Sequence, residues 1–288
     1  MGIKNIAKRM MKYLPDKLYL KIQYGYNTHR KLNLKSPTRY NEKLQWIKLY
    51  DRQPIYTDFV DKYKVKRIVA ERIGKQYVVP LLAVWDRPDD IDISMLPDKF
   101  VMKTNHDSKG VIVCKDKSKF DLKQAKAFFS ERMAANGYDY GREWPYKGVV
   151  KKIIAEQYIE DESGGLIDYK VLCFNGVPKL IQLHQGRFTD HHTQDFYDVD
   201  WNVQSFNQVG EVSSESPAPR PSFLSEMLEL SAKLSAGIPH IRVDWYHANG
   251  QLYFGEMTFF DASGYLDFIP DEYNEIIGSW IKLPEKDR

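Results

Sequence analysis

The stretch RVDWYHANGQLYFGEMTFFDASG, residues 242–264, predicts a β-hairpin that carries charged side chains on one face. Two strand-like segments flank a turn at Ala248-Asn249-Gly250: HIRVDWY (240–246) and QLYFGEMTF (251–259). Arg242 and Asp244 share a face of the first strand, and Glu256 and Thr258 share a face of the second. Because their neighbours are aromatic and aliphatic, the pattern favours a partly enclosed site over a solvated hairpin face.

The register of this hairpin decides whether Asp244 and Glu256 meet. With regular pairing, a two-residue turn at Asn249-Gly250 would place Asp244 opposite Gly255 and send Glu256 to the other face. A three-residue loop starting at Ala248 would shift the pairing by one residue and bring Glu256 back. We therefore expect this loop, or another one-residue register shift, with the two carboxylates about 4 to 7 Å apart around a metal position.

The rest of the chain predicts further antiparallel strands separated by a few helices, which indicates an α+β architecture. Five more segments are strand-like: 99–105, 111–116, 153–159, 169–174 and 178–184. Asn175-Gly176, between the last two, predicts a second tight hairpin. Helices are expected over DFVDKYKVKRIVAERIG (58–74), which ends in a glycine typical of a C-cap, and over about 222–237.

Composition places the chain among globular proteins of one or two closely packed domains, since it has 288 residues of which 43% are hydrophobic. The net charge of +3 gives no sign of nucleic-acid binding. Residues 1–52, however, carry 13 basic and only three acidic side chains. With two separate cysteines, Cys114 and Cys173, and no secretory or membrane-spanning pattern, the sequence predicts a cytoplasmic protein.

The first 14 residues have apolar side chains at helical spacing between lysines and an arginine. This pattern is typical of a basic amphipathic helix, which either lies on an anionic membrane surface or packs its apolar stripe on the body of the protein.

Two strands carry residues suited to a nucleotide. Lys103 precedes the polar loop HDSKG, and a lysine there can hold phosphates as a point charge. Glu156 leads from an apolar strand into an irregular stretch, where a carboxylate and main-chain groups can hydrogen-bond a purine edge. Taken alone, Lys103 is read in preference as an exposed strand lysine, and the alternative for Glu156 is an edge-strand carboxylate that faces solvent.

From LNLKSPTRYNEKLQWIKLYDR (32–52) through FGEMTF, the order of these segments resembles the ATP-grasp superfamily, and within it the TupA-like group of polysaccharide biosynthesis loci. The resemblance implies two α+β lobes with antiparallel sheets that clasp a nucleotide, at 58–155 and 156–288, after a basic, mainly helical region, 1–57. The phosphate loop NHDSKG has fewer glycines than is usual in the superfamily, and Thr258 stands where an asparagine is common.

The resemblance also implies roles for individual residues. ATP would be bound by residues of the first lobe and the segment that follows it: Lys62, Lys103, Ser108, Gly110, Glu156, Gln157, Tyr158, Ile159 and Asp168. Mg²⁺ would be bound by Asp244, Glu256 and Thr258, and Arg242 would stabilise the reacting groups. The implied activity is ATP-dependent formation of an amide bond between a carboxylate and an amine, through an acyl phosphate.

The family context implies small-molecule or glycan substrates, such as an acidic sugar joined to an amino acid or amino sugar. Two other classes stay open. Asp198-Val199-Asp200 matches the DxD metal motif of glycosyltransferases, and a binding module without catalysis is the third reading. ATP with Mg²⁺ would stabilise a ligase, whereas a UDP-sugar with Mn²⁺ would stabilise a glycosyltransferase.

Overall fold

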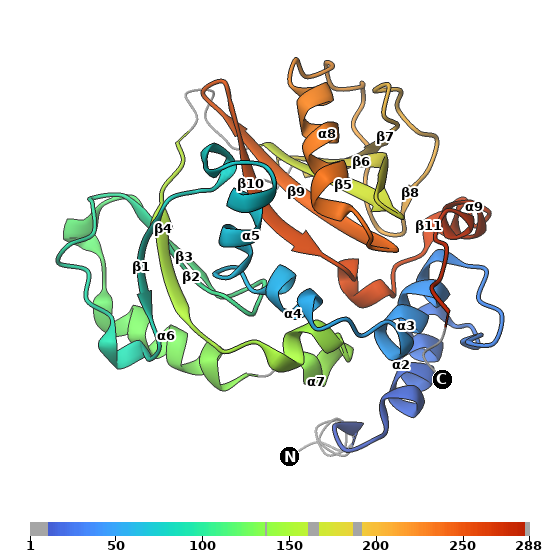
Figure 1. Cartoon of the computed structure of the whole chain (residues 1–288), viewed down its shortest axis with the longest axis horizontal. Coiled ribbons are helices and arrows are strands. Elements are labelled where there is room, and N and C mark those ends of the chain that lie inside the picture. Colours follow the sequence, from blue (N-terminus) through green and yellow to red (C-terminus); the bar gives the residue numbers. More distant parts are fainter. Residues whose placement is uncertain (1–10, 136, 161–166, 187–191, 286–288) are drawn as a thin grey trace.

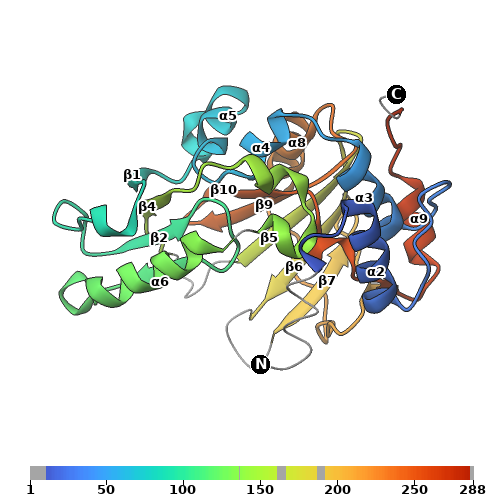
Figure 2. The same cartoon turned by 90° about the horizontal axis from the view of Figure 1, so that it is seen from below.

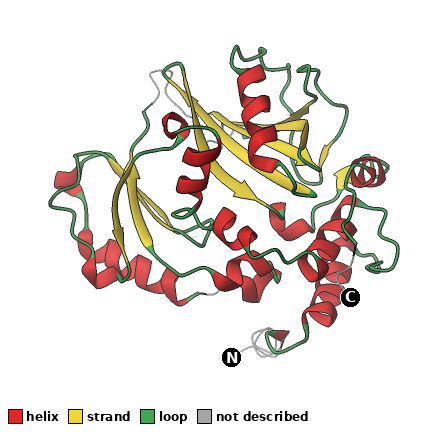
Figure 3. Cartoon of the chain, viewed as in Figure 1, coloured by secondary structure: helices red, strands yellow, loops and turns green. Residues whose placement is uncertain are grey.

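The computed structural model describes residues 11–135, 137–160, 167–186 and 192–285. Its two main antiparallel sheets lie side by side, with helices around them (Figure 1, Figure 3). The smaller sheet has the order β1-β4-β2-β3. Its strands are β1 Leu81–Trp85, β2 Phe100–Thr104, β3 Val111–Cys114 and β4 Ile153–Gln157. Helix α6, Leu122–Ala134, packs against this sheet. Phe129 of the helix is buried with Phe100 and Met102 of the sheet in a small core that is separate from the core of the larger sheet.

The larger sheet has five strands in the order β10-β9-β5-β6-β7. They are β5 Ile167–Phe174, β6 Val177–Gln185, β7 Thr193–Tyr197, β9 His240–Ala248 and β10 Gln251–Thr258. Asn175 and Gly176 form the tight turn between β5 and β6 with φ angles of 52° and 80°, so the hairpin expected there is confirmed. Helix α8, Leu224–Ser235, packs on this sheet.

Helices from both ends of the chain gather at the side of the molecule away from the smaller sheet (Figure 1, Figure 2). These are α2 Asp16–Thr28, α3 Tyr40–Tyr50 and α9 Tyr273–Ser279. A short sheet beside them pairs β8, Asn207–Gln208, with β11, Phe268–Ile269. The remaining short helices are α7 Tyr138–Gly141 and the 3₁₀ segments Lys75–Tyr77, Pro88–Asp90, Lys117–Lys119, Trp144–Gly148 and Asp261–Gly264.

The expectation of one helix over 58–74 is wrong. The segment forms α4, Ile55–Val60, and α5, Val65–Arg72, with a break at 61–64. The break has a local cause, because the Asp61 carboxylate accepts the backbone N–H groups of Tyr63 and Lys64 at 2.9 and 3.3 Å. Such a bond competes with the helical hydrogen bonds that would otherwise continue through this point.

The segment of α4 and α5 lies between the two sheets (Figure 1). Its apolar side chains, among them Phe59, Val65 and Val69, belong to the core under the five-stranded sheet. The start of the first lobe, expected at residue 58, therefore falls inside a segment that shares the larger core. Lys62, in the break, reaches the five-stranded sheet, where its Nζ lies 3.0 Å from Glu256 Oε2, whereas Lys66 on α5 reaches the smaller sheet, where its Nζ lies 2.7 Å from Glu156 Oε1.

The predicted amphipathic helix over residues 1–14 lies largely outside the described residues. Of its apolar stripe, Leu14 lies in the described part of the chain, where it and Met11 pack against the larger core. Among the helices of the described ranges, none has the length and apolar character needed to cross a bilayer.

Candidate active site

The hairpin of β9 and β10 turns through Asn249 and Gly250, which have φ angles of 50° and 80°. Ala248 pairs with Gln251, so the turn has two residues. These positive φ angles are typical of the tight turn that Asn-Gly favours. The three-residue loop named in the sequence analysis is therefore wrong.

A one-residue register shift is present nevertheless, at a bulge after Phe254. Beyond it Glu256 lies directly opposite Asp244, so the two carboxylates come to neighbouring positions of one face, as the sequence predicted. Gly255 forms the bulge, and a Cβ atom there would lie 2.9 Å from Tyr246 Cε2 and 3.1 Å from the Asp244 carbonyl oxygen. The bulge therefore needs a residue without a side chain.

Asp244 is 1% exposed, and cations bind both of its oxygens. Arg242 donates to it twice, from Nε at 2.7 Å and from Nη2 at 2.8 Å. Lys170 Nζ on the adjacent β5 donates at 2.7 Å and also contacts Asp168 at 2.6 Å. Burial raises the pKa of Asp244, while Arg242 and Lys170 act in the opposite direction. The buried carboxylate is stable because these two cations accompany it.

Arg242 also contacts other oxygen-bearing side chains near Asp244. Its Nη1 donates to Asp261, which follows β10, and its Nη2 lies 3.4 Å from Thr258 Oγ1 and 3.6 Å from Glu256 Oε1. Burial disfavours the charge of Asp261, yet Arg242 and its other partners leave the pKa of that carboxyl below its usual value. Arg242 thus holds several acidic side chains at one end of the hairpin.

Glu256 is the more accessible of the two hairpin carboxylates, with a side chain that is 30% exposed. Its Oε2 lies 3.0 Å from Lys62 Nζ, which comes from the break between α4 and α5. Burial raises the pKa of Glu256, but Lys62 and Arg242 more than offset this and leave it well below its usual value. The sequence placed Lys62 and Glu256 in one site, and the structure brings them into contact.

Asn105 fixes the position of the Lys62 segment. Its carbonyl oxygen accepts the Lys62 backbone N–H at 3.0 Å, and its side-chain Nδ2 donates to Asp61 at 2.8 Å. Its Oδ1 accepts the N–H of Lys152, next to β4, at 2.7 Å. Asn105 follows β2 directly, so one amide side chain connects the strand of Lys103 to the turn of Lys62.

Glu156 lies on the smaller sheet between two lysines. Its side chain is 5% exposed, with Oε1 2.7 Å from Lys66 Nζ and Oε2 2.6 Å from Lys103 Nζ. Burial raises the pKa of Glu156, but Lys103 and Lys66 outweigh it and leave the pKa below its usual value. Lys66 was missed in the sequence, although it follows Lys62 by four residues and so belongs to the same short segment.

We expect this arrangement to make stability sensitive to acid. Since the folded-state pKa of Glu156 lies below its unfolded value, its contribution is present above about pH 4.5 and is lost as the pH falls through the folded pKa. Denaturant unfolding at pH 6 and at pH 3.5 should show a smaller loss of unfolding free energy for Glu156→Gln than for the wild type. Equal losses in both proteins would contradict the paired state of Glu156.

The loop between β2 and β3 is already hydrogen-bonded. Asp107 Oδ1 accepts the backbone N–H groups of Lys109 and Gly110, and Asp107 also pairs with Arg132. Ser108 is exposed at the tip, and Gly110 is buried against Thr104, whose Oγ1 would clash with an added Cβ atom. In this conformation the amide of Gly110 is directed to Asp107, so an anion at the loop would have to displace that carboxylate.

The segment expected to bind adenine connects the two sheets. β4 ends at Gln157, whose N–H donates to the Pro80 carbonyl at 3.0 Å, and Tyr158 and Ile159 follow as half-buried irregular chain. The hairpin tip reaches this segment, since Asn249 Nδ2 donates to the Glu160 carbonyl at 2.8 Å.

The residues present fit a magnesium nucleotide. Mg²⁺ in nucleotide sites is held by one or two carboxylates together with phosphate oxygens, and Asp244 opposite Glu256 supplies that donor set with the Thr258 hydroxyl close by. Among the residues that the structure describes, no group of three or more His, Cys, Asp or Glu side chains is arranged to hold a metal ion by itself. Lys62, Lys66 and Lys103 supply the positive charge that polyphosphate needs.

The DxD pattern of the sequence has a structural explanation. Asp198 Oδ1 accepts the backbone N–H groups of Asp200 and Asn202 at 3.0 and 2.8 Å, so this carboxylate stabilises a turn. Lys170 and Asp261 were also missed in the sequence. Lys170 follows Asp168 by two residues and therefore lies on the same strand face. This spacing from a candidate site residue could have identified Lys170 in the sequence.

Solved structures with similar folds are ligases of low sequence identity. D-alanine–D-alanine ligase from Helicobacter pylori is 16% identical, with 86% of this chain and 70% of that one covered and a TM-score of 0.46. The ligase of the same name from Bacillus anthracis, complexed with ATP, is 15% identical, with 70% and 53% covered and a TM-score of 0.41. ATP-grasp ligase PsnB complexed with minimal precursor is 9% identical, with 76% and 60% covered and a TM-score of 0.39.

This chain spans little more than half the length of the Bacillus anthracis structure. No curated protein matches it. The sequence model of the TupA-like ATP-grasp family matches residues 42–282, which include both sheets and every residue of the paired hairpin. The chain therefore belongs to the TupA-like ATP-grasp family and has the ATP-grasp fold.

Proposed function

We propose that this protein is an ATP-dependent carboxylate–amine ligase that forms an amide bond through an acyl phosphate. The observation that carries the proposal is the pairing of Asp244 with Glu256 on one face of the hairpin, in contact with Lys62, Lys170 and Arg242. Carboxylates that can share a metal with phosphate, beside lysines that can hold phosphate, support phosphoryl transfer.

In the proposed reaction the substrate carboxylate attacks the γ-phosphorus of ATP and ADP leaves. The amine then attacks the acyl carbon, loses a proton and expels inorganic phosphate, which leaves an amide. Lys62, Lys66 and Lys103 would bind the phosphates, in competition with Glu256 and Glu156, their partners in the structure. The phosphates of ATP would then replace these two carboxylates as partners of the lysines, with little rearrangement of the two sheets.

Mg²⁺ held by Glu256 and, in competition with Lys170 and Arg242, by Asp244 would neutralise the charge that spreads over the phosphate oxygens. Thr258 would support it through its hydroxyl. Arg242 keeps Asp244 and Asp261 in place and would stabilise the negative charge of the acyl phosphate and of the tetrahedral state. Ser108 and Gly110 would border the phosphates.

The remaining nucleotide contacts of the proposal lie in the connecting segment. Glu156, Gln157, Tyr158 and Ile159 would surround the adenine, and Asp168 would approach the ribose. The proposed lobes are 58–155 and 156–288, preceded by the basic region 1–57; this division falls inside β4, whose last residues, Glu156 and Gln157, belong to the smaller sheet.

The proposed substrates are an acidic glycan or its precursor and an amino acid or amino sugar, joined during biosynthesis of a surface polysaccharide. Family membership supports this choice. The proposed location is the cytoplasm, where ATP is available and where Cys114 and Cys173, both free thiols, would stay reduced. Contact of residues 1–14 with an anionic membrane remains a prediction.

The test has two parts. ATP with Mg²⁺ should raise the Tm, whereas a UDP-sugar with Mn²⁺ should leave it unchanged. ADP release should then be measured against uronic acids combined with amino acids and amino sugars, with mass spectrometry of the products. An amide product would establish the reaction, and stabilisation by the UDP-sugar alone would favour a glycosyltransferase instead.

Lys62→Ala is expected to weaken ATP binding or turnover about 10- to 100-fold, because a charge-assisted hydrogen bond to phosphate is lost. The fold should persist, since Glu256 keeps Arg242 as a neighbour. Lys64→Ala is the matched control, because Lys64 belongs to the same segment but pairs with Asp58 at the surface. Equal ATP kinetics in both variants would refute the role of Lys62.

A further inference from the structure

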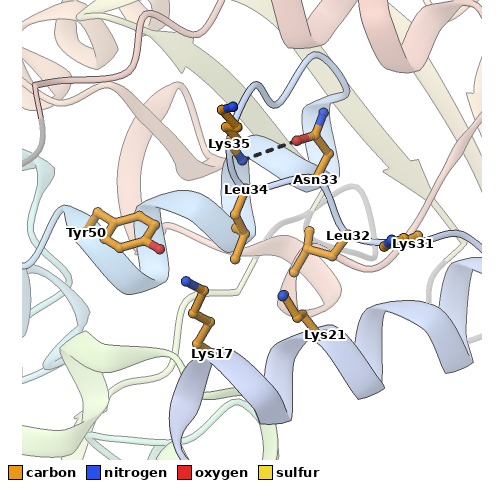
Figure 4. A pocket seen from close by; sticks show the side chains of 8 residues that line it. All are labelled: Lys17, Lys21, Lys31, Leu32, Asn33, Leu34, Lys35 and Tyr50. Carbon is orange, nitrogen blue, oxygen red and sulfur yellow. Dashed lines mark hydrogen bonds between the residues drawn. The ribbon is translucent and has the colours of Figure 1, made fainter.

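A second basic site lies away from the paired hairpin, at the end of the molecule formed by α2 and α3. A cavity of about 520 Å³ opens between α2 and the loop 31–35 (Figure 4). Lys17 and Lys21 project from α2 toward the loop, which itself supplies Lys31 and Lys35. This volume is in the range of pockets that hold small ligands. We refer to this cavity as the basic pocket.

The four lysines of the basic pocket carry charge that the protein itself does not neutralise. All four are exposed, and in the described part of the chain none has an ion pair with a carboxylate. Lys17 and Lys21 are four residues apart on one helix, a spacing at which like charges repel and destabilise the helix slightly. An anion in the cavity would relieve this repulsion, so the pocket is electrostatically suited to a ligand with several negative charges.

The loop of the basic pocket is fixed in place before any ligand binds. Glu42 accepts the backbone N–H groups of Asn33, Thr38 and Arg39. Asn33 Oδ1 in turn accepts the N–H of Lys35 at 3.2 Å (Figure 4). Because the loop backbone is held at these points, little backbone conformational entropy is lost when its two lysines bind an anion.

Apolar and aromatic groups lie between the charges. Leu32 and Leu34 are 5% and 7% exposed and line the cavity from the loop, and the half-buried Tyr50 lines it from α3. A sugar ring has apolar C–H faces that pack on such surfaces, while carboxylate substituents reach outward to cations. A concave site with both kinds of group fits a saccharide better than the flat surface of a bilayer.

We propose that the basic pocket binds an acidic saccharide through Lys17, Lys21, Lys31 and Lys35. Two of the elements that line it, α2 and the loop 31–35, precede residue 42 and so lie outside the stretch that the family model matches. The pocket is therefore a recognition site particular to the front region of this chain. That the saccharide is the acceptor of the ligase rests on the proposed function, whereas the binding itself does not.

The test measures binding of hexagalacturonate to the full chain by calorimetry, without ATP or Mg²⁺. Lys17→Gln/Lys21→Gln and Lys31→Gln/Lys35→Gln should each weaken binding by at least about tenfold, since each removes two charge-assisted contacts. The control Lys115→Gln/Lys123→Gln makes the same change in net charge at two exposed lysines of the smaller lobe and should bind like the wild type. Fully methyl-esterified hexagalacturonate should bind much more weakly.

Several results would overturn the proposal: no binding by the wild type, equal weakening in the control, or equal affinity for the methyl ester. Two further measurements test whether the pocket binds a different anion, a phosphate or an anionic lipid. Pyrophosphate that displaces the saccharide at the same concentration would indicate a phosphate site. Binding to phosphatidylglycerol vesicles that depends on the four lysines, without saccharide binding, would indicate a membrane contact. Because no nucleotide is used, a failure here leaves the ligase proposal standing, and a failed ligase assay leaves this binding result standing.

Discussion

Replacing Glu256 by glutamine is expected to reduce ATP turnover by at least about a hundredfold while the protein stays folded. Glu256 lies opposite Asp244 and is the more exposed carboxylate of the pair, so it is the one that a metal–phosphate group reaches most easily. The substitution keeps the size of the side chain but removes a charge and one oxygen donor. Lys62 loses its carboxylate partner, which costs little because Lys62 would be free to bind phosphate instead.

ADP release as a function of Mg²⁺ concentration checks this expectation. The variant should need more Mg²⁺ for half-maximal activity, a change that a purely structural role of Glu256 would not produce. Glu131→Gln, an exposed position on α6, is the control and should behave like the wild type. Normal turnover with an unchanged Mg²⁺ requirement in Glu256→Gln would exclude the hairpin as the metal site.

The second large effect is expected on stability. The double variant Lys66→Met/Lys103→Met leaves Glu156 as a buried carboxylate without its two cations, which should lower the unfolding free energy by about 3 to 5 kcal/mol. Each single variant should lose less, because one lysine remains to pair with Glu156. Denaturant unfolding at neutral pH measures these differences.

Adding Glu156→Gln to the double variant should restore most of the lost stability, because the uncompensated charge is gone. ATP turnover should remain low in the triple variant, since the phosphate-binding lysines are still missing. This combination separates the cost of a buried charge from the role in nucleotide binding. A triple variant no more stable than the double one would mean that the lysines stabilise the protein through packing alone.

The tight turns and the strand faces of the hairpin residues are encoded locally. Asn249-Gly250 and Asn175-Gly176 form tight turns because asparagine and glycine tolerate positive φ angles, and this is a property of the residues themselves. The alternation of Arg242 with Asp244, and of Glu256 with Thr258, puts each pair on one strand face for the same local reason. The ordered set of motifs was sufficient to predict the ATP-grasp fold.

Other features depended on contacts between distant segments. The sequence required a one-residue shift in the hairpin but did not locate it at Gly255, because Tyr246 and the backbone of Asp244 determine where a residue without a Cβ atom is needed. The helix expected over 58–74 is interrupted at Asp61, whose carboxylate is held in place by Asn105 from the end of β2. A helical pattern contains no information about that partner.

The sequence by itself determined the fold family, the two tight turns and the face on which each hairpin residue lies, because backbone preference and side-chain alternation act over a few residues. Only the tertiary structure decided that Glu156 pairs with Lys66 and Lys103, and that four exposed lysines of α2 and the loop 31–35 line one cavity. Ion pairs and cavities form between segments far apart in the chain, so their energies depend on distances and burial that exist only after the sheets and helices have packed.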